Sequence, residues 1–336
     1  MPIIAQKWTS MMNPFNPDSF DRLVKPGPRV PQLVDWLLTQ VWTQDRFSRV
    51  KPADYLNQGE VLVHHAEEII ATAAWRVYDE LAAAAAGAAS LMPQAGGTTA
   101  FVIFDGLSLR ELPVLLRLAA ASRLRIVEPP RAAYAALPSD TNSFVEQRLI
   151  GKRVPPSQLP QRAELKERAI KAFYLDDAIS SQHIDASADE GLLVWSAFPD
   201  VTYRDSSARS DRHYDTICSL FESAWKNTVM QVPRGRRIVI MGDHGYVYFG
   251  AGMAATRTSA ACDMLEQNRF KLFSKTETMP DSENEKDIQV LPERRLAMLR
   301  GRLKNRPQGP SANMSFRHGG LSLMEILVPW LVLEHE

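Results

Sequence analysis

Hydrophobic positions follow two different patterns along this chain. Up to about residue 91 they recur every three or four residues, first over residues 30–47 and then over 59–91. This spacing places apolar side chains on one face of a helix. From about residue 98 onward, short and continuous apolar runs alternate with longer amphipathic segments. The sequence therefore predicts an N-terminal arm and helical region over residues 1–94, followed by an α/β domain over 95–336.

The apolar runs of the second part are typical of parallel strands. The run over residues 238–241 has no obvious polar face and ends at a glycine, as expected for a strand buried on both sides. We expect a mostly parallel central sheet with helices on both of its faces. The predicted strands cover residues 100–104, 124–127, 191–197, 238–241 and 328–333.

Residues 251–306 interrupt this alternation. Residues 251–290 are polar and too long for a simple loop, and residues 292–306 carry the densest run of basic side chains in the chain. We interpret the whole segment as an insertion beside the functional site and predict a short helix over 292–306.

Three of the predicted strands run into an aspartate. Asp105, Asp200 and Asp243 each follow an apolar run, and His244 comes directly after the last of them. Ligands of doubly wound sheets bind at the carboxyl ends of the strands, so these side chains are expected to lie together. Each aspartate alone would also suit a helix N-cap. Carboxylate and imidazole together favour a divalent transition metal, and His318, before paired glycines, offers a second imidazole.

A hydroxyl-rich turn, LPSDTNSF, lies between the second and third predicted strands. Thr141 or Ser143 at the start of the following helix would serve as an ordinary N-cap. The chemical alternative is a nucleophile whose hydroxyl is activated by metal coordination.

Composition limits the classes of partner. The chain has 336 residues and a formal net charge of zero, so it has no overall field that would attract a polyanion. Nucleic acid binding would depend on local patches within residues 148–171 and 292–306. Glutamates between the basic residues of the first segment also fit a merely solvated face.

The two cysteines, Cys218 and Cys262, are too few for a disulfide framework and lack metal-ligand spacing. They predict buried thiols in a reducing, cytoplasmic location. The N-terminal residues do not have the pattern of a signal peptide. No apolar run reaches the roughly 18–20 residues of a membrane helix, so we expect no membrane contact.

Four segments, in this order, resemble the PglZ domain, a branch of the alkaline phosphatase superfamily found in BREX-type phage-defence systems. They are FVIFDGLSLRELP, LPSDTNSF, IVIMGDHGYV and RHGGLSLMEILVPWLVL, within residues 98–336. The resemblance implies an alkaline phosphatase-like fold and two divalent metal ions, zinc or alternatively manganese. One ion would be held by Asp105, Asp243, His244 and the nucleophile Thr141, and the other by Asp200 and His318.

The chain departs from the superfamily pattern at one ligand. Phosphodiesterases of the superfamily usually place a histidine four residues after the aspartate that corresponds to Asp200, and here that residue is Arg204. Asp205 and His213 are possible substitutes at other offsets.

The predicted function is a metal-dependent phosphoric ester hydrolase, a phosphodiesterase or nuclease acting with other proteins of a defence system. Arg204 supports the alternative of a phosphatase-like scaffold without turnover. A second alternative, sulfate ester hydrolysis, is disfavoured by the ordinary threonine in the nucleophile turn.

Overall fold

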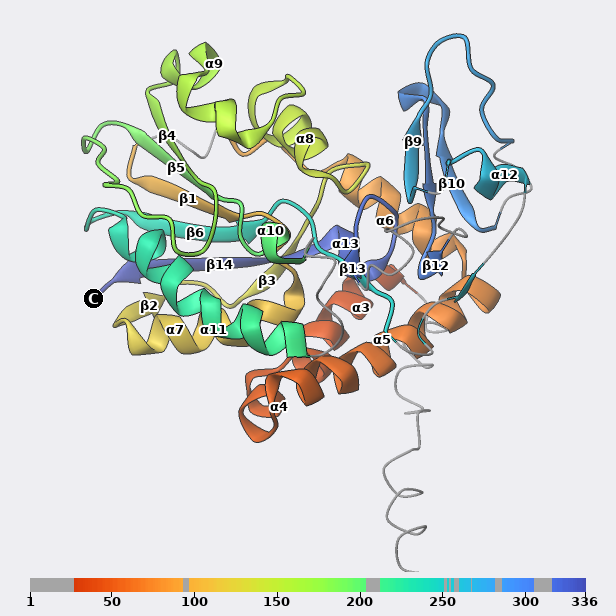
Figure 1. The fold of residues 1–336 in the computed structure, drawn as a ribbon, viewed down its shortest axis with the longest axis horizontal. Coiled ribbons are helices and arrows are strands. Elements are labelled where there is room, and N and C mark those ends of the chain that lie inside the picture. The colour runs from red at the N-terminus through yellow and green to blue at the C-terminus, as the bar shows by residue number, and fades with distance from the viewer. Residues whose placement is uncertain are drawn as a thin grey trace, which may run out of the picture.

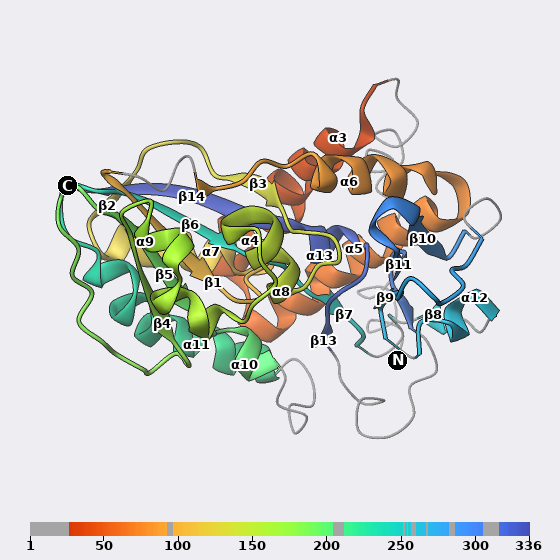
Figure 2. The same ribbon diagram turned by 90° about the horizontal axis from the view of Figure 1, so that it is seen from above.

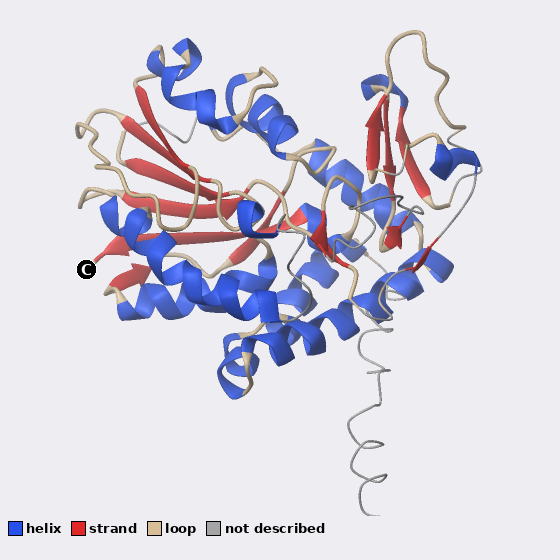
Figure 3. Cartoon of the chain, in the orientation of Figure 1, coloured by secondary structure: helices blue, strands red, loops and turns tan. Residues whose placement is uncertain are grey.

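A computed structural model describes residues 27–92, 97–203, 212–250, 253, 255–256, 260–266, 268–281, 286–304 and 316–336. Its centre is a seven-stranded sheet in the order β2-β14-β6-β1-β5-β4, with β3 also paired to β14 (Figures 1 and 3). Only β14 runs against its neighbours, so the sheet is mostly parallel, as predicted. The strands are β1 Thr99–Phe104, β2 Leu124–Ile126, β3 Arg131–Tyr134, β4 Ile170–Leu175, β5 Gly191–Ser196, β6 Arg237–Gly242 and β14 Leu327–His335.

Both faces of this sheet are covered by helices. Along β1, Val102 and Phe104 belong to one hydrophobic cluster, while Phe101 and Ile103 belong to another. Successive side chains of a strand point to opposite faces, so an uninterrupted apolar run requires a layer on each side. The first layer contains α7 Leu112–Ala121 and α11 Arg212–Asn227, and the second contains α8 Thr141–Phe144 and the π-helix Val145–Ile150.

The N-terminal helices pack against the same core. They are α3 Arg29–Trp36, the π-helix Leu37–Val41, α4 Gln44–Arg49, α5 Pro52–Ala73 and α6 Arg76–Ala86. Val63 of α5 and Leu81 of α6 share one buried cluster with Met324, just before β14. The predicted helix over 59–91 is thus two helices that separate at Ala74, beyond which α6 starts at Arg76. Figures 1 and 2 show these helices beside the edge of the sheet at which its parallel strands end.

The segment that we interpreted as an insertion contains a small sheet of its own. Strands β9 Phe270–Leu272, β10 Ile288–Leu291 and β11 Leu296–Leu299 form an antiparallel sheet over a separate apolar cluster, with α12 Ala260–Asp263 nearby. The short helix predicted over 292–306 is wrong. A single 3-10 turn, Pro292–Arg294, is followed by β11 and by β12 Leu303–Lys304, which pairs with β8 Ala255–Thr256.

Several basic side chains of the two predicted patches face inward. Arg148, Arg300 and Arg302 are buried, and Arg302 forms ion pairs with Glu60 and Glu67 of α5. In the earlier segment Glu164 pairs with both Lys152 and Arg162. The buried arginines are thus not part of a basic surface, whereas Lys166 and Arg168 of the earlier segment are exposed. Arg306 lies outside the described residues.

Other expectations hold. Cys218 and Cys262 are buried free thiols, and no helix within the described ranges is long and apolar enough to cross a membrane. After Ser322 comes α13 Leu323–Ile326, whose first turn is closed by a capping box between Ser322 and Glu325. The predicted N-terminal arm falls almost wholly outside the described residues.

Candidate metal centre

The segment after β6 turns tightly because two glycines allow close backbone contacts. A Cβ atom on Gly242 would lie 2.1 Å from the carbonyl oxygen of Leu107, and one on Gly245 would lie 2.1 Å from that of Met324. No other residue type fits at such distances. The turn holds Asp243 and His244 fully buried at the carboxyl end of the central strand.

Two neighbouring strands bring the other predicted aspartates to the same edge. Strand β1 pairs with β6 on one side and β5 on the other. Asp105 directly follows β1, and Asp200 begins the short helix α10 Asp200–Tyr203 after β5. Both side chains are buried. The three aspartates therefore meet for the reason that the sequence suggested, because parallel strands end at one edge.

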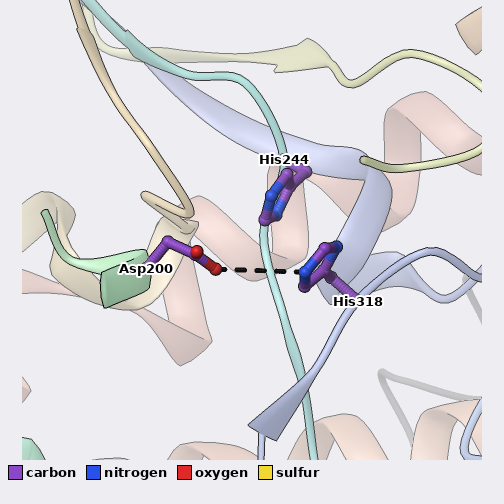
Figure 4. Close-up of side chains that lie close together, drawn as sticks. All are labelled: Asp200, His244 and His318. Atoms are coloured by element: carbon purple, nitrogen blue, oxygen red, sulfur yellow. Dashed lines mark ion pairs between the residues drawn. The ribbon is translucent and has the colours of Figure 1, made fainter. Parts of the chain in front are cut away.

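His318 arrives by a separate hairpin-like pairing. Strand β13 Phe316–Arg317 is antiparallel to β7 Val247–Tyr248, with Arg317 opposite Val247. This pairing stacks the imidazole of His318 on that of His244, with ring centroids 4.0 Å apart and an interplanar angle of 12°. Figure 4 shows both rings with Asp200, whose Oδ1 lies 3.9 Å from Nε2 of His318.

The gathered side chains form two overlapping groups with the geometry of metal ligands. One contains Asp105, Asp243 and His244, and the other contains Asp200, His244 and His318; within each group, the ligand atoms lie within 4.8 Å of one another. Oxygen and imidazole nitrogen donors of this kind suit zinc or manganese.

Thr141 lies beside the first group. It is the first residue of α8, and Asp140 is the N-cap, accepting hydrogen bonds from the backbone of Asn142 and Ser143. The expectation that Thr141 or Ser143 caps this helix is wrong. Since capping is done by Asp140, the hydroxyl of Thr141 is available for the site: Oγ1 donates to Oδ1 of Asp105 at 3.2 Å and lies 3.3 Å from Nε2 of His244.

The ring nitrogens of the histidines define their protonation. Nδ1 of His244 lies 3.1 Å from the carbonyl oxygen of Gly245, and Nδ1 of His318 lies 3.1 Å from that of Ser139. A carbonyl oxygen only accepts, so each Nδ1 must carry the proton and donate. In a neutral ring, Nε2 then presents a lone pair, the form in which histidine binds metals.

These lone pairs face carboxylates. Nε2 of His244 lies 3.5 Å from Oδ1 of Asp105 and 3.7 Å from Oδ2 of Asp243. Burial, followed by repulsion from His318, lowers the pKa of His244 to about 3, so its ring is neutral at physiological pH. An acceptor nitrogen thus faces acceptor oxygens. A bound cation would make this arrangement favourable, and the donor set fits a divalent metal.

The carboxylate of Asp243 also lacks a donor for one of its oxygens among the described residues. Its Oδ1 accepts hydrogen bonds from the backbone of Gly106 and His244, at 2.8 and 2.9 Å. Its Oδ2 is buried and has no hydrogen-bond partner among the described residues. Burial raises the pKa of Asp243 to about 6 despite those backbone hydrogen bonds. Because buried polar atoms normally have a partner, this oxygen is a candidate ligand for a metal ion.

The substitutes for the departure at Arg204 are not both described. Arg204 and Asp205 lie outside the described residues. His213 directs Nε2 at the carbonyl oxygen of Thr202, 2.7 Å away, and is not among the clustered ligands.

Several supporting residues were not predicted. Ser139 donates to the carbonyl oxygen of Gly320 and accepts from the backbone of Gly319, which fixes the loop after His318. Tyr246 is buried, with its ring centroid 5.4 Å from that of His244 and 5.3 Å from that of His318. For Tyr246 the sequence contained one signal: it is an aromatic residue two positions after the predicted ligand His244.

No protein-family signature matches this chain, and no curated protein sequence does. Among solved structures it is similar to murine ectonucleotide pyrophosphatase/phosphodiesterase 5, with 11% identity, TM-score 0.42, and coverage of 71% of this chain and 88% of that one. It is also similar to phosphonoacetate hydrolase from Sinorhizobium meliloti 1021 in complex with phosphonoformate, with 12% identity, TM-score 0.40, and coverage of 70% and 90%. A function has to be argued from the side chains of this chain itself.

Proposed function

We propose that this chain is a metal-dependent phosphoric ester hydrolase of the alkaline phosphatase superfamily, of the PglZ type, with Thr141 as its nucleophile. The observation that carries this proposal is the arrangement around Thr141 Oγ1, which lies within hydrogen-bond distance of the buried carboxylate of Asp105 and of Nε2 of His244, beside the two groups of possible metal ligands.

Asp105, Asp243, His244 and Thr141 would hold one divalent ion, and Asp200 and His318 the other. When bound, such ions neutralise phosphoryl oxygens and lower the pKa of a coordinated hydroxyl. Zinc suits the mixed oxygen and nitrogen donors, and manganese is the alternative.

The residues of the chain supply position and direction. Asp140 fixes the first turn of α8, so the hydroxyl of Thr141 stays at the edge of the site. Asp105 accepts the hydroxyl proton in a hydrogen bond and leaves the remaining lone pairs of Oγ1 free to attack phosphorus. Attack forms an oxygen–phosphorus bond to Thr141 and breaks the bond from phosphorus to the leaving oxygen, which departs as an alcohol with the proton that Thr141 gives up. Water then hydrolyses the ester on Thr141, which releases the phosphomonoester and returns the free hydroxyl.

The biological setting is the finer part of the proposal. The PglZ resemblance favours a role in phage defence with other proteins of such a system. Nucleic acid gains no support as substrate from Arg148, Arg300 and Arg302, which are buried, or from Lys152 and Arg162, which are paired with Glu164. Arg204 at an expected ligand position keeps a scaffold without turnover as the second candidate.

Metal analysis of the purified protein, combined with hydrolysis of bis(4-nitrophenyl) phosphate, tests the proposal. We expect the wild-type protein to bind zinc and release nitrophenolate. Thr141→Ala should keep the metal and lose activity by about 10³-fold or more. His244→Ala should lose both metal and activity. Ser143→Ala is the matched control, since it removes a neighbouring hydroxyl of the same turn.

Activity retained in Thr141→Ala but lost in Ser143→Ala would transfer the nucleophile to Ser143. Tight metal binding without hydrolysis of any phosphoester by the wild-type protein would favour the scaffold. Metal content that is unchanged in His244→Ala would rule out the metal centre.

A further inference from the structure

A pocket of about 460 Å³ lies beside the nucleophile turn. One wall is the turn itself, with Leu137, Pro138 and Ser143, and the opposite wall is the small antiparallel sheet, with Leu272 of β9 and Leu296 of β11. Its volume is within the range of pockets that bind small organic molecules, about 300–1,000 Å³. The apolar walls suit a carbon skeleton rather than a bare ion.

The two chain segments that form the walls of the pocket also contribute residues beside the candidate metal centre. In the turn, the carbonyl oxygen of Ser139 accepts from His318, and Thr141 follows two residues later. In β9, the ring of Phe270 lies where a Cβ on Gly319 would be, at 2.5 Å. Leu272 is two residues further along this strand, about 7 Å away at the usual rise per residue. A molecule in the pocket is thus flanked by the same two segments that hold His318.

The polar side of the pocket carries an uncompensated positive charge. Arg294, at the end of the 3-10 turn before β11, is half-buried and donates one hydrogen bond to Oε1 of Gln147 at 3.0 Å. No ion pair joins Arg294 to an acidic side chain among the described residues. The other lining arginine, Arg153, is different, because it pairs with Asp140 at 3.1 Å and with Glu146 at 3.9 Å.

The guanidinium group of Arg148 is a second positive charge near Arg294. Burial, and then the nearby charge of Arg294, lowers the pKa of Arg148 to about 10. Arg148 donates only to backbone carbonyl oxygens, those of Ala85, Ala88 and Ala135. Arg294 and Arg148 therefore repel each other without a carboxylate between them, and an anion beside Arg294 would relieve this repulsion.

We propose that this pocket binds an organic substituent of the phosphoester substrate, and that Arg294 recognises a second anionic group on that substituent. The inference rests on the proposed function and specifies it further. The substrate class is a phosphodiester that carries another phosphate or a carboxylate away from the reacting phosphorus. Arginine is suited to this role because its planar group can donate two parallel hydrogen bonds to such an anion.

Two chromogenic esters with the same reacting group test the proposal. One is thymidine 5′-(4-nitrophenyl phosphate), and the other is the same ester with an added 3′-phosphate. We expect the wild-type protein to prefer the second in kcat/KM. In Arg294→Met this preference should fall by about tenfold, the effect of one charge-assisted hydrogen bond. Arg168→Met, which removes the same charge from an exposed position elsewhere, should leave it unchanged.

A second pair of variants tests the pocket without removing the arginine. Leu272 is 43% exposed on the pocket wall, so a charged residue there can be accommodated. Leu272→Glu should lower the preference for the 3′-phosphorylated ester, and Leu272→Lys should raise it. Equal effects of the two substitutions would overturn the proposal.

Binding separates this proposal from the proposed function. In calorimetry with Thr141→Ala protein, thymidine 3′,5′-bisphosphate should bind more tightly than thymidine 5′-phosphate, and Arg294→Met should abolish the difference. If neither ester is hydrolysed but this binding difference is found, the proposed function fails while the pocket assignment stands. If hydrolysis occurs but neither preference depends on Arg294, the pocket assignment is wrong and the proposed function stands.

Discussion

Two of the buried acidic side chains, Glu60 and Asp243, have neighbours of opposite kinds. Glu60 of α5 has no exposed side-chain surface and is paired with Arg110 and Arg302. Asp243 is equally buried at the candidate metal centre, but its neighbours there include the imidazole of His244, and no lysine or arginine among the described residues pairs with it. Burial alone would raise both pKa values. The pKa of Glu60 is nevertheless below its usual value because the two arginines outweigh burial, whereas that of Asp243 rises to about 6.

The difference indicates what each cluster is for. A buried carboxylate needs a positive partner, and where the chain provides an arginine the result is structural. Where it provides imidazoles and no arginine, as around Asp243, a bound cation would supply the positive charge. Glu60, Arg110 and Arg302 form the arginine-paired cluster, which lies next to the candidate metal centre. Arg110 donates to the carbonyl oxygen of Tyr246, and Arg302 donates to that of Tyr248. The arginine-paired cluster thus supports the strand that follows His244.

The largest expected effect is on the arginine-paired cluster. Glu60→Gln leaves two buried guanidinium groups without their shared carboxylate, and breaking a buried ion pair costs about 3–5 kcal/mol. We expect the free energy of unfolding to fall by this amount in urea titrations, with or without zinc. Asp45→Asn is the matched control, because it breaks an exposed ion pair with Arg49 worth at most about 1 kcal/mol. A loss below 1 kcal/mol for Glu60→Gln would mean that the arginines find other partners.

The second effect has the opposite sign. The folded state holds the proton of Asp243 more tightly than the unfolded chain, whose pKa is near 3.8. This group's contribution to stability is therefore greatest below pH 4 and is lost as pH rises to above 6. A shift of about two pKa units corresponds to about 3 kcal/mol. Without metal at pH 8, Asp243→Asn should thus be more stable than the wild-type protein by about 2–3 kcal/mol.

Urea unfolding in the presence of a chelator at pH 4, 6 and 8 measures this difference. The gain should be absent at pH 4, and zinc should stabilise the wild-type protein but not the variant. A variant that is less stable than the wild-type protein at pH 8 without metal would show that protein groups, not a cation, compensate Asp243.

The contrast between the clusters also explains what could be predicted from sequence. Asp105, Asp200 and Asp243 were identified because each follows an apolar run, and local patterns of that kind specify where parallel strands end. The structure brings these three together with Thr141, His244 and His318. The arginine-paired cluster gave no such signal, because the ion pairs of Arg302 are with Glu60 and Glu67, more than 230 positions earlier in the chain. The helix predicted over 292–306 was wrong because β11 and β12 pair with strands outside that segment.

Two strands of the central sheet were missed for a related reason. Strands β3, with sequence RAAY, and β4, with IKAFYL, each contain a basic residue and are mostly half-buried. Their pairing with β14 and β5 depends on partners distant in sequence. Asp140 was missed as the N-cap because Asp140, Thr141 and Ser143 are all residue types that cap helices. Only the backbone conformation selects among them.

The smallest expected effect concerns Tyr246, which holds the metal-centre loops by aromatic contact rather than by charge. Its ring meets the edges of both imidazoles, packs 4.7 Å from the ring of Tyr203 after Asp200, and occupies the space beside Gly106. Its hydroxyl is buried and has no hydrogen-bond partner among the described residues.

Tyr246→Leu should therefore lower zinc affinity by about tenfold, as expected for a residue that orients ligands without binding the metal. Tyr246→Phe keeps the ring and should retain the affinity, measured for both variants by competition with a chromophoric chelator. If Phe weakens zinc binding as much as Leu does, the hydroxyl and not the ring is responsible. The metal-centre loops would then be held by a polar contact, and the contrast between this centre and the arginine-paired cluster would be smaller than we infer.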